Sequence, residues 1–186
     1  KELAPAPAVA KGRAPGLTAD GVFECKHESF PFGAHVAVVA VDRATGGVRV
    51  ERYLASFDIG VAVNPMLVHG QIAGSMVQGL GGAMLEHLQY DEQGQFLTGS
   101  LADYLLPTAS DFPNLRAIVE DRYPSPINPL GAKGAGEGGT IVAGGVLGNA
   151  VSNALSTLGL QTNQLPLSPD AIWQMVGKAG KSKHAA

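Results

Sequence analysis

The chain carries the sequence GAKGAGEGGT at residues 131–140, in which five of the ten residues are glycine. Glycine has no Cβ, so the backbone of such a loop can approach a ligand closely. One carboxylate, that of Glu137, lies within the loop, and an apolar helical pattern follows it. This order predicts a loop that ends at a helix N-terminus, where free N–H groups and the helix dipole favour anions. A single acid at a backbone-lined site of this kind is a candidate general base.

The same residues admit other interpretations. A Gly-rich surface loop fits the composition equally well. The segment GAGEGG at residues 134–139 also matches the dinucleotide-binding fingerprint, which needs a strand just before it and an acid about 20 residues later. Three prolines lie in residues 123–129, and no Asp or Glu occurs between Glu137 and Asp170. Because proline is excluded from central strands, the strand that must precede the fingerprint is missing, and so is the acid that must follow it. The residue directly after Lys133 is Gly134 and not Ser or Thr, which excludes a P-loop.

Composition narrows the class of protein. A length of 186 residues is sufficient for one domain with a hydrophobic core, or for two small lobes. The net charge of −3 provides no basic surface for nucleic acid, and no stretch of apolar residues is long enough to predict a membrane span. The chain has one cysteine, Cys25, and its five histidines lack metal-binding spacing. We therefore expect no metal ligand among its side chains, and any metal must be held by another group.

Local patterns predict an α+β fold in which β-hairpins pack with glycine-rich helices. The expected elements are a hairpin of residues 35–41 and 48–54 around a turn at 45–47, a helix over 64–88, a second hairpin connection at 90–95, a strand over 115–120, and helices over 140–158 and 168–176. Asn64 as N-cap and Pro65 at the first position begin the long helix. Its glycines each cost about 1 kcal/mol relative to Ala, so we expect close packing against them.

The ends of the chain differ in composition from its centre. Residues 1–20 are rich in Ala, Pro and Gly and are predicted to form a linker or extended arm. Residues 21–177 form the predicted domain, and residues 178–186 form a basic tail that we expect to be disordered. The chain begins without an initiator Met or a signal-peptide pattern. We expect a piece of a longer protein or a processed subunit, in the cytoplasm, or in the periplasm if a partner subunit carries a signal.

Four segments in a fixed order carry a resemblance to a known family: DIGVAVNP at 58–65, GQIAGSMVQGLG at 70–81, DYLLPT at 103–108 and GAKGAGE at 131–137. Together they resemble the C-terminal part of the large, molybdopterin-binding subunit of the molybdenum hydroxylases. This superfamily comprises xanthine dehydrogenase, aldehyde oxidase and carbon monoxide dehydrogenase. The resemblance covers roughly residues 20–175, and four motifs at the expected spacing make it far more specific than any one motif.

The resemblance implies a cofactor and site residues. The cofactor is molybdopterin cytosine dinucleotide, whose dithiolene holds the molybdenum without a protein ligand. The implied cofactor-binding residues are Gly70, Gln71, Lys133, Gly134, Ala135 and Gly136. Gln78 either supports Gln71 or is an ordinary polar helix position. Glu137 matches the catalytic glutamate, a general base that accepts a proton as water-derived oxygen is transferred to an electron-poor carbon of an N-heterocycle, an aldehyde or CO.

The resemblance also implies partners. Electrons must leave through [2Fe–2S] clusters and FAD. Because this chain has one cysteine, it cannot hold the clusters, so we expect an iron–sulfur subunit and a FAD subunit as partners. The remainder of the Mo-binding subunit is a further partner, and the chain is expected to be inactive alone. The competing hypothesis is a non-catalytic cofactor-binding or assembly module whose Gly-rich loop binds an anion. Glu137 argues against this module, because its charge would repel a phosphate.

Overall fold

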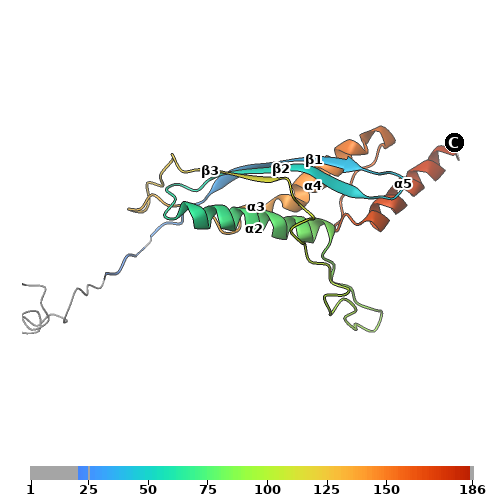
Figure 1. Cartoon of the computed structure of the whole chain (residues 1–186), viewed down its shortest axis with the longest axis horizontal. Helices are drawn as coiled ribbons and strands as arrows, with labels where there is room; N and C mark the ends of the chain where they lie inside the picture. Colours follow the sequence, from blue (N-terminus) through green and yellow to red (C-terminus); the bar gives the residue numbers. More distant parts are fainter. Residues whose placement is uncertain (1–20, 25, 185–186) are drawn as a thin grey trace, which may run out of the picture.

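The computed structural model describes residues 21–24 and 26–184, with side chains up to residue 179. The expected linker over residues 1–20 lies outside the described residues, and the predicted domain boundaries remain predictions. The elements in chain order are β1 (Phe32–Val41), β2 (Val48–Asp58), α2 (Pro65–Met84), β3 (Leu115–Glu120), α3 (Gly138–Ile141), α4 (Ala143–Ala154), the 3-10 turn η1 (Ser156–Leu158) and α5 (Pro169–His184), as Figure 1 shows. The predicted α+β class is confirmed.

The predicted hairpin is confirmed as the antiparallel pair β1–β2. Its turn is closed by two backbone hydrogen bonds between Asp42 and the glycines, with Gly46 N donating to Asp42 O at 2.8 Å and Asp42 N donating to Gly47 O at 2.8 Å. Gly46 has φ +75°, a left-handed conformation that favours glycine. A Cβ at Gly46 would also meet the backbone of Pro169, so this turn packs directly against the start of α5.

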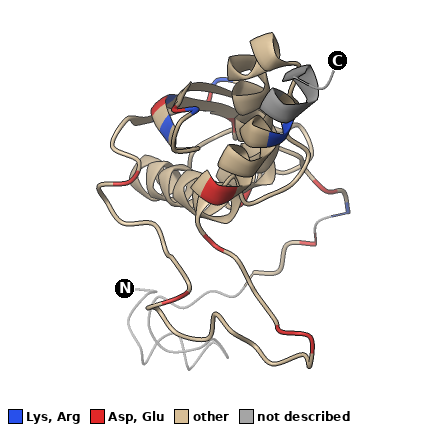
Figure 2. Ribbon diagram, turned by 90° about the vertical axis from the view of Figure 1, so that its right-hand side faces the viewer, with Lys and Arg blue, Asp and Glu red and all other residues tan. Residues whose placement is uncertain are grey.

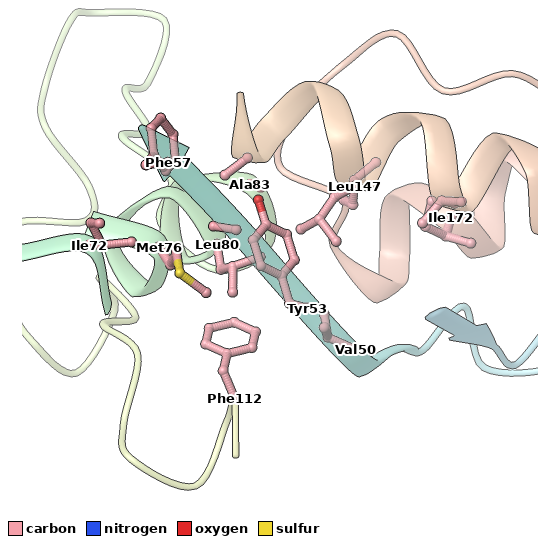
Figure 3. Close-up of a cluster of buried hydrophobic side chains, with 14 of the residues drawn as sticks. Val50, Tyr53, Phe57, Ile72, Met76, Leu80, Ala83, Phe112, Leu147 and Ile172 are labelled. Atoms are coloured by element: carbon pink, nitrogen blue, oxygen red, sulfur yellow. The ribbon is translucent and has the colours of Figure 1, made fainter. Parts of the chain in front are cut away.

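The third strand joins the hairpin from a distance. β3 pairs in parallel with β2, which gives the sheet order β1-β2-β3, and α2 forms the connection between these two strands. Alternate residues of β2, including Tyr53 and Phe57, point to one face and are buried there. Figure 3 shows Tyr53 lying among Leu80 of α2 and Leu147 of α4, so both helices cover this face of the sheet.

The helix expected over residues 140–158 is interrupted, and that expectation is wrong. The structure has two helices, α3 and α4, separated by Val142 at φ −105° and ψ 0°, and then the turn η1. α3 docks on α2, where Gly139 and Thr140 bond Ser75. The long helix α2 ends at Met84 rather than at residue 88, and α5 continues past residue 176 to His184. At 90–95 the structure has an isolated bridge between Tyr90 and Phe96 in place of paired strands.

All glycines of α2 were expected to pack closely against other parts of the chain, but only some of them do. A Cβ at Gly79 would lie 2.6 Å from Ala143 Cβ, and one at Gly81 would lie 2.5 Å from Pro107 Cγ. A Cβ at Gly70, Gly74 or Gly82 would meet no atom of the described chain within 4 Å. The expectation of close packing is therefore wrong for these three positions within this chain.

Several large apolar side chains lie on the surface. Near the start of α2, Met66 and Leu67 are 75% and 60% exposed, and Ile141 of α3 is 73% exposed. Exposed apolar side chains of this size, where they gather in a patch, usually mark a contact with another part of a protein. Within the described part of the chain, none of the helices combines the length and hydropathy that a bilayer crossing requires.

Candidate functional site

The glycine-rich loop begins beside the end of β2. Val61 N and Ser125 N both donate to Gly131 O, at 2.9 and 2.8 Å, and Lys133 N donates to Ile59 O at 2.8 Å. An isolated antiparallel bridge joins Gly60 to Ala132. These backbone bonds attach the first part of the loop to the segment that leaves the sheet, so its position follows that of β2.

A side-chain amide reinforces this attachment. Asn128 Nδ2 donates to Ala132 O at 2.8 Å, and Ala132 N donates to Asn128 Oδ1 at 3.1 Å. The amide thus bonds both backbone groups of Ala132, as a neighbouring strand would. The sequence analysis did not single out Asn128, because nothing in its local pattern distinguishes it from any other Asn in a turn.

Lys133 forms an ion pair at the base of the loop. Its Nζ lies 2.5 Å from Asp58 Oδ2, and Gly60 N donates to Asp58 Oδ1 at 3.0 Å. The hydrogen bond from Lys133, and secondly the one from Gly60, lower the pKa of Asp58 below its ordinary value. Both side chains are largely enclosed, at 16% and 20% exposure. The structure therefore gives Lys133 an anchoring contact, whereas the sequence predicted a cofactor contact for it.

We expect Lys133→Met and Asp58→Asn to loosen the loop equally. The carboxyl pKa is depressed in the folded state, so the pair stabilises the fold above the unfolded pKa of about 4 and is lost as the pH falls through the lower, folded value. Both variants should unfold at a lower temperature at pH 7 and show a weaker loss of stability on acidification. Thermal unfolding of the assembled enzyme between pH 3 and pH 7 measures this. Loss of cofactor in Lys133→Met but not in Asp58→Asn would instead support direct cofactor binding by Lys133.

The second part of the loop docks on α2 through α3. Gly139 N donates to Ser75 Oγ at 3.1 Å, and Thr140 Oγ1 donates to Ser75 O at 2.8 Å. A Cβ at Gly139 would clash with Ser75 Oγ and lie 2.6 Å from Met76 N. Ser75 is itself buried. The sequence analysis missed Ser75, whose position within the α2 motif gave no sign of a partner so far along the chain.

Glu137 lies between the two anchored segments. It is the N-cap residue of α3, and its backbone oxygen accepts from Thr140 N at 3.0 Å and from Ile141 N at 3.3 Å. The side chain makes no capping hydrogen bond and is exposed. The backbone is thus held on both sides while the carboxylate remains accessible, and this combination suits a proton acceptor.

The loop ends at the N-terminus of α3, as expected, and anion binding there stays a prediction. α3 extends only over Gly138–Ile141, and the N–H of Gly139 is occupied by Ser75 Oγ. An anion could use the Gly139 N–H only by displacing that bond. The bond to Ser75 leaves fewer N–H groups for a phosphate than the alternative hypothesis expected.

The predicted cofactor-binding residues face open space. Gln71 and Gly70 are exposed on α2, next to Ile72, whose carbonyl oxygen lies where Gly139 docks. Gln78 follows two helical turns after Gln71 on the same face and is also exposed. Gly134 and Gly136 are exposed, and Ala135 is half-buried. α2 contains no Asp, Glu, Lys or Arg, so its ribbon is tan in Figure 2 and it adds no acidic or basic side chain of this kind to the site.

Four exposed glycines are required neither by the backbone conformation nor by packing within this chain. Gly70, Gly74, Gly134 and Gly136 are absent from the positive-φ residues of the described chain. A Cβ there would meet nothing closer than 3.9 Å, the distance from Gly134 to Pro31 Cδ. A group from outside this chain that approaches the backbone closely would account for them. The residues present therefore fit a bound cofactor.

No cluster of three or more His, Cys, Asp or Glu side chains that could hold a metal occurs among the described residues.

Comparison with known proteins assigns the family. Residues 1–113 match the model of the molybdopterin cofactor-binding domain. The chain is 42% identical over 159 residues to the gamma subunit of the 6-hydroxypseudooxynicotine dehydrogenase complex of Paenarthrobacter nicotinovorans, a match that covers 86% of this chain and 20% of that protein. It is 35% identical over 163 residues to the carbon monoxide dehydrogenase large chain of Hydrogenophaga pseudoflava, covering 88% of this chain and 20% of that one.

Solved structures agree with these matches. The Cu,Mo carbon monoxide dehydrogenase superposes with a TM-score of 0.85 at 31% identity, over 96% of this chain and 22% of that chain. Quinoline 2-oxidoreductase from Pseudomonas putida 86 superposes with a TM-score of 0.75 at 38% identity, over 78% of this chain and 18% of that chain. The chain belongs to the molybdopterin cofactor-binding domain family of the molybdenum hydroxylases. It spans about a fifth of the length of the curated relatives that it matches.

Proposed function

We propose that this chain forms one wall of the active site of a molybdenum hydroxylase that transfers water-derived oxygen to an electron-poor carbon, with Glu137 as the general base. The observation that carries the proposal is the position of Glu137, whose backbone is held on both sides while its carboxylate is accessible. The open glycines beside it leave room for a cofactor to approach the backbone.

The chemistry of Glu137 follows from this position. The cofactor, when bound, supplies the transferred oxygen and accepts the electrons. A carboxylate at the site accepts the proton that is released as the new carbon–oxygen bond forms. Lys133 lies in the same loop, but its charge is neutralised by Asp58. Glu137 is thus free of a competing ion pair with that ammonium.

The finer assignments follow the family. We propose that the cofactor is molybdopterin cytosine dinucleotide, bound by Gln71 and by the backbone of Gly70, Gly134, Ala135 and Gly136. The substrate class is an N-heterocycle, an aldehyde or CO, in keeping with the names of the relatives. The remainder of the Mo subunit, an iron–sulfur subunit and a FAD subunit are the proposed partners, in the cytoplasm. The apolar surface around Met66 and Ile141 is available to such partners.

Native purification tests this function. The complex that contains this chain should hold molybdenum and show the absorption bands of flavin and iron–sulfur clusters. A complex that contains none of the three would support the assembly module instead. A complex with molybdenum and clusters but without flavin would retain the hydroxylase and remove only the proposed FAD subunit.

We expect Gln71→Ala to reduce the molybdenum and pterin content of the purified complex. Gln71 is exposed on an uncharged helix face, so its amide is available to the cofactor and supports nothing within the described chain. The loss of one such hydrogen bond weakens binding by about 0.5–1.5 kcal/mol, or roughly 2- to 10-fold. Gln95→Ala, at the turn formed by residues 90–96, is the control and should leave the content unchanged. An unaltered content in Gln71→Ala would remove this residue from the cofactor site.

A further inference from the structure

β1 is an exposed edge of the sheet with little protection against pairing. The sheet order β1-β2-β3 leaves one side of β1 without a neighbouring strand in the described chain. Natural edge strands are commonly blunted by short length, charged side chains, proline or a covering segment. The other edge, β3, is six residues long and carries Arg116 and Glu120, whereas β1 is ten residues long and contains no Asp, Glu, Lys, Arg or Pro. One register shift, where Glu51 of β2 has no partner, leaves Phe32–Val38 as a regular edge that is open to another strand.

A groove of about 550 Å³ follows this edge between β1 and α4. Five consecutive residues of β1, 35–39, line it. Since alternate residues of a strand point to opposite faces, a run of consecutive residues indicates a groove beside the strand and not beneath its face. The other wall is formed by α4, through Val146, Asn149, Ala150 and Asn153, whose spacing places them on one side of the helix. We call this space the β1–α4 groove.

α4 reaches past the edge of the sheet at this groove. Its buried residues Ala143, Leu147 and Val151 pack into the core, and the helix contacts both β1 and α2. Figure 1 shows α4 alongside β1. The residues of the groove lie on a different side of the helix from the three buried ones. A fourth strand, about 4.8 Å from β1, would cover this side.

Two amide side chains of the groove are without a partner in the described chain. Asn149 and Asn153 are exposed and lie about one helical turn apart on α4. Neither side chain makes a hydrogen bond with another described residue. Elsewhere in this chain, the amide of Asn128 bonds both backbone groups of Ala132. The two free amides are therefore suited to the backbone of a polypeptide, and the apolar residues of the groove are suited to its side chains.

We propose that an extended segment from the remaining part of the Mo-binding subunit pairs with β1 as a fourth strand and fills the β1–α4 groove with alternate side chains. This inference rests on the proposed function, which makes this chain one part of a larger subunit. Backbone hydrogen bonds to a sheet edge give such docking its affinity, and pockets for alternate side chains give it specificity. The fourth strand also satisfies the outward N–H and C=O groups of β1.

The surroundings of the groove define the chemistry of the segment. Neither β1 nor α4 contains an Asp, Glu, Lys or Arg. A charged side chain that entered the groove would find no opposite charge there, so the segment should be uncharged and should alternate with small apolar residues. This chain spans about a fifth of the length of the curated relatives that it matches, so most of the subunit is available to supply the segment.

A second copy of this chain fits the edge poorly. Its β1 would bring its own α4, which packs against that strand in the same way. Antiparallel pairing of two β1 strands about a two-fold axis places both α4 helices on the same face of the joined sheet. Because α4 lines the groove beyond the edge of β1, each helix would then lie in the space that the other one needs.

Hydrogen exchange of the complete enzyme complex, measured at single residues, tests the pairing directly. In a free edge strand, the amides that bond β2 exchange slowly, and those that point outward exchange about 10-fold faster or more, because they lack a hydrogen bond. We expect both sets to exchange slowly over residues 33–38. Fast exchange of alternate β1 amides in the intact complex would overturn the inference.

Photo-crosslinking identifies the paired segment. The photoreactive amino acid p-benzoylphenylalanine replaces Asn153 in the complex, and mass spectrometry locates the crosslinked peptide. We expect a peptide from the remaining part of the Mo-binding subunit with an uncharged, alternating sequence. A crosslink to a second copy of this chain, to its residues 1–20 or to another subunit would contradict the proposal, as would the absence of any crosslink.

Asn149→Trp fills the groove from the side of α4 and should displace the fourth strand. We expect alternate amides of residues 33–38 to exchange about 10-fold faster or more than in the wild-type complex, and the complex to unfold at a lower temperature. Gln93→Trp is the matched control, because it makes the same change from amide to indole at an exposed turn and should alter neither quantity. Equal exchange in Asn149→Trp and the wild type would show that nothing occupies the groove.

A milder change keeps the test decisive if Asn149→Trp prevents assembly. Asn149→Ala and Asn153→Ala, made in one chain, remove the two amides without adding volume. Exchange of the outward β1 amides should then rise by about 2- to 10-fold, the effect of losing a hydrogen bond to the docked segment. No rise in this double variant would remove the amides from the proposed contact.

The outcomes separate this inference from the proposed function. A complex that holds molybdenum but shows fast exchange of alternate β1 amides retains the function and loses the fourth strand. A complex without molybdenum, flavin or iron–sulfur clusters rejects the function, whatever the exchange of β1.

Discussion

Glu137→Gln is expected to lower kcat of the assembled enzyme by about 10²–10⁴, the contribution typical of a general base. The amide keeps the size and hydrogen-bonding reach of the carboxylate but cannot accept a proton. Since the Glu137 side chain makes no capping bond, the substitution removes no interaction that holds α3. The fold, the molybdenum content and KM should therefore change little. Steady-state kinetics with metal analysis of the same preparation separate a loss of chemistry from a loss of cofactor.

A surface glutamate gives the control for this experiment. Glu92→Gln lies at an exposed turn and makes the same change of charge, so its kcat should match that of the wild type. Near-wild-type turnover in Glu137→Gln would show that another group takes the proton.

Gly139→Ala is expected to have the largest effect on assembly. The new Cβ would clash with Ser75 Oγ and lie 2.6 Å from Met76 N and 2.7 Å from Ile72 O, all within α2. Two of these three atoms belong to the helix backbone and cannot move aside, so α3 must separate from α2. Overpacking of this kind costs about 1–3 kcal/mol or more. We expect a lower unfolding temperature and a lower yield of assembled complex, with activity lost through displacement of Glu137.

Gly145→Ala is the matched control. Gly145 lies in α4, where a Cβ meets no atom within 4 Å, so the methyl group should be neutral or should stabilise the helix by up to about 1 kcal/mol. Equal stability of the two variants would contradict the docking of α3 on α2. Gly74 lies on the side of α2 that faces away from α3, and a substitution there tests whether another part of the enzyme covers this side. Because a side chain there meets nothing in this chain, harm from Gly74→Val would report a contact with the rest of the enzyme.

The helices and strands that depend on the pattern of neighbouring residues could be predicted from the sequence. The signals for these elements are the β-branched residues of 35–41, the alternation in 48–54, the Asn64 cap with Pro65 after it, and the strand pattern at 115–120. Each of them depends on neighbours in the chain. The structure confirms them as β1 and β2, the start of α2, and β3. The break at Val142 could not be predicted in this way, because the residues around it have an unbroken helical pattern. It is imposed by the fit of Gly139 against α2.

The sequence by itself determined the family, through four motifs in order, and it identified Glu137 as the residue to explain. The tertiary structure alone decided what holds Glu137 in place. Lys133 pairs with Asp58 from β2, Gly139 bonds Ser75 of α2, and the ring of Phe57 in β2 packs against Gly138. Each of these contacts joins residues far apart in the chain, so no local pattern encodes it. They form only when the packing of sheet and helices brings these groups together and excludes water from between them.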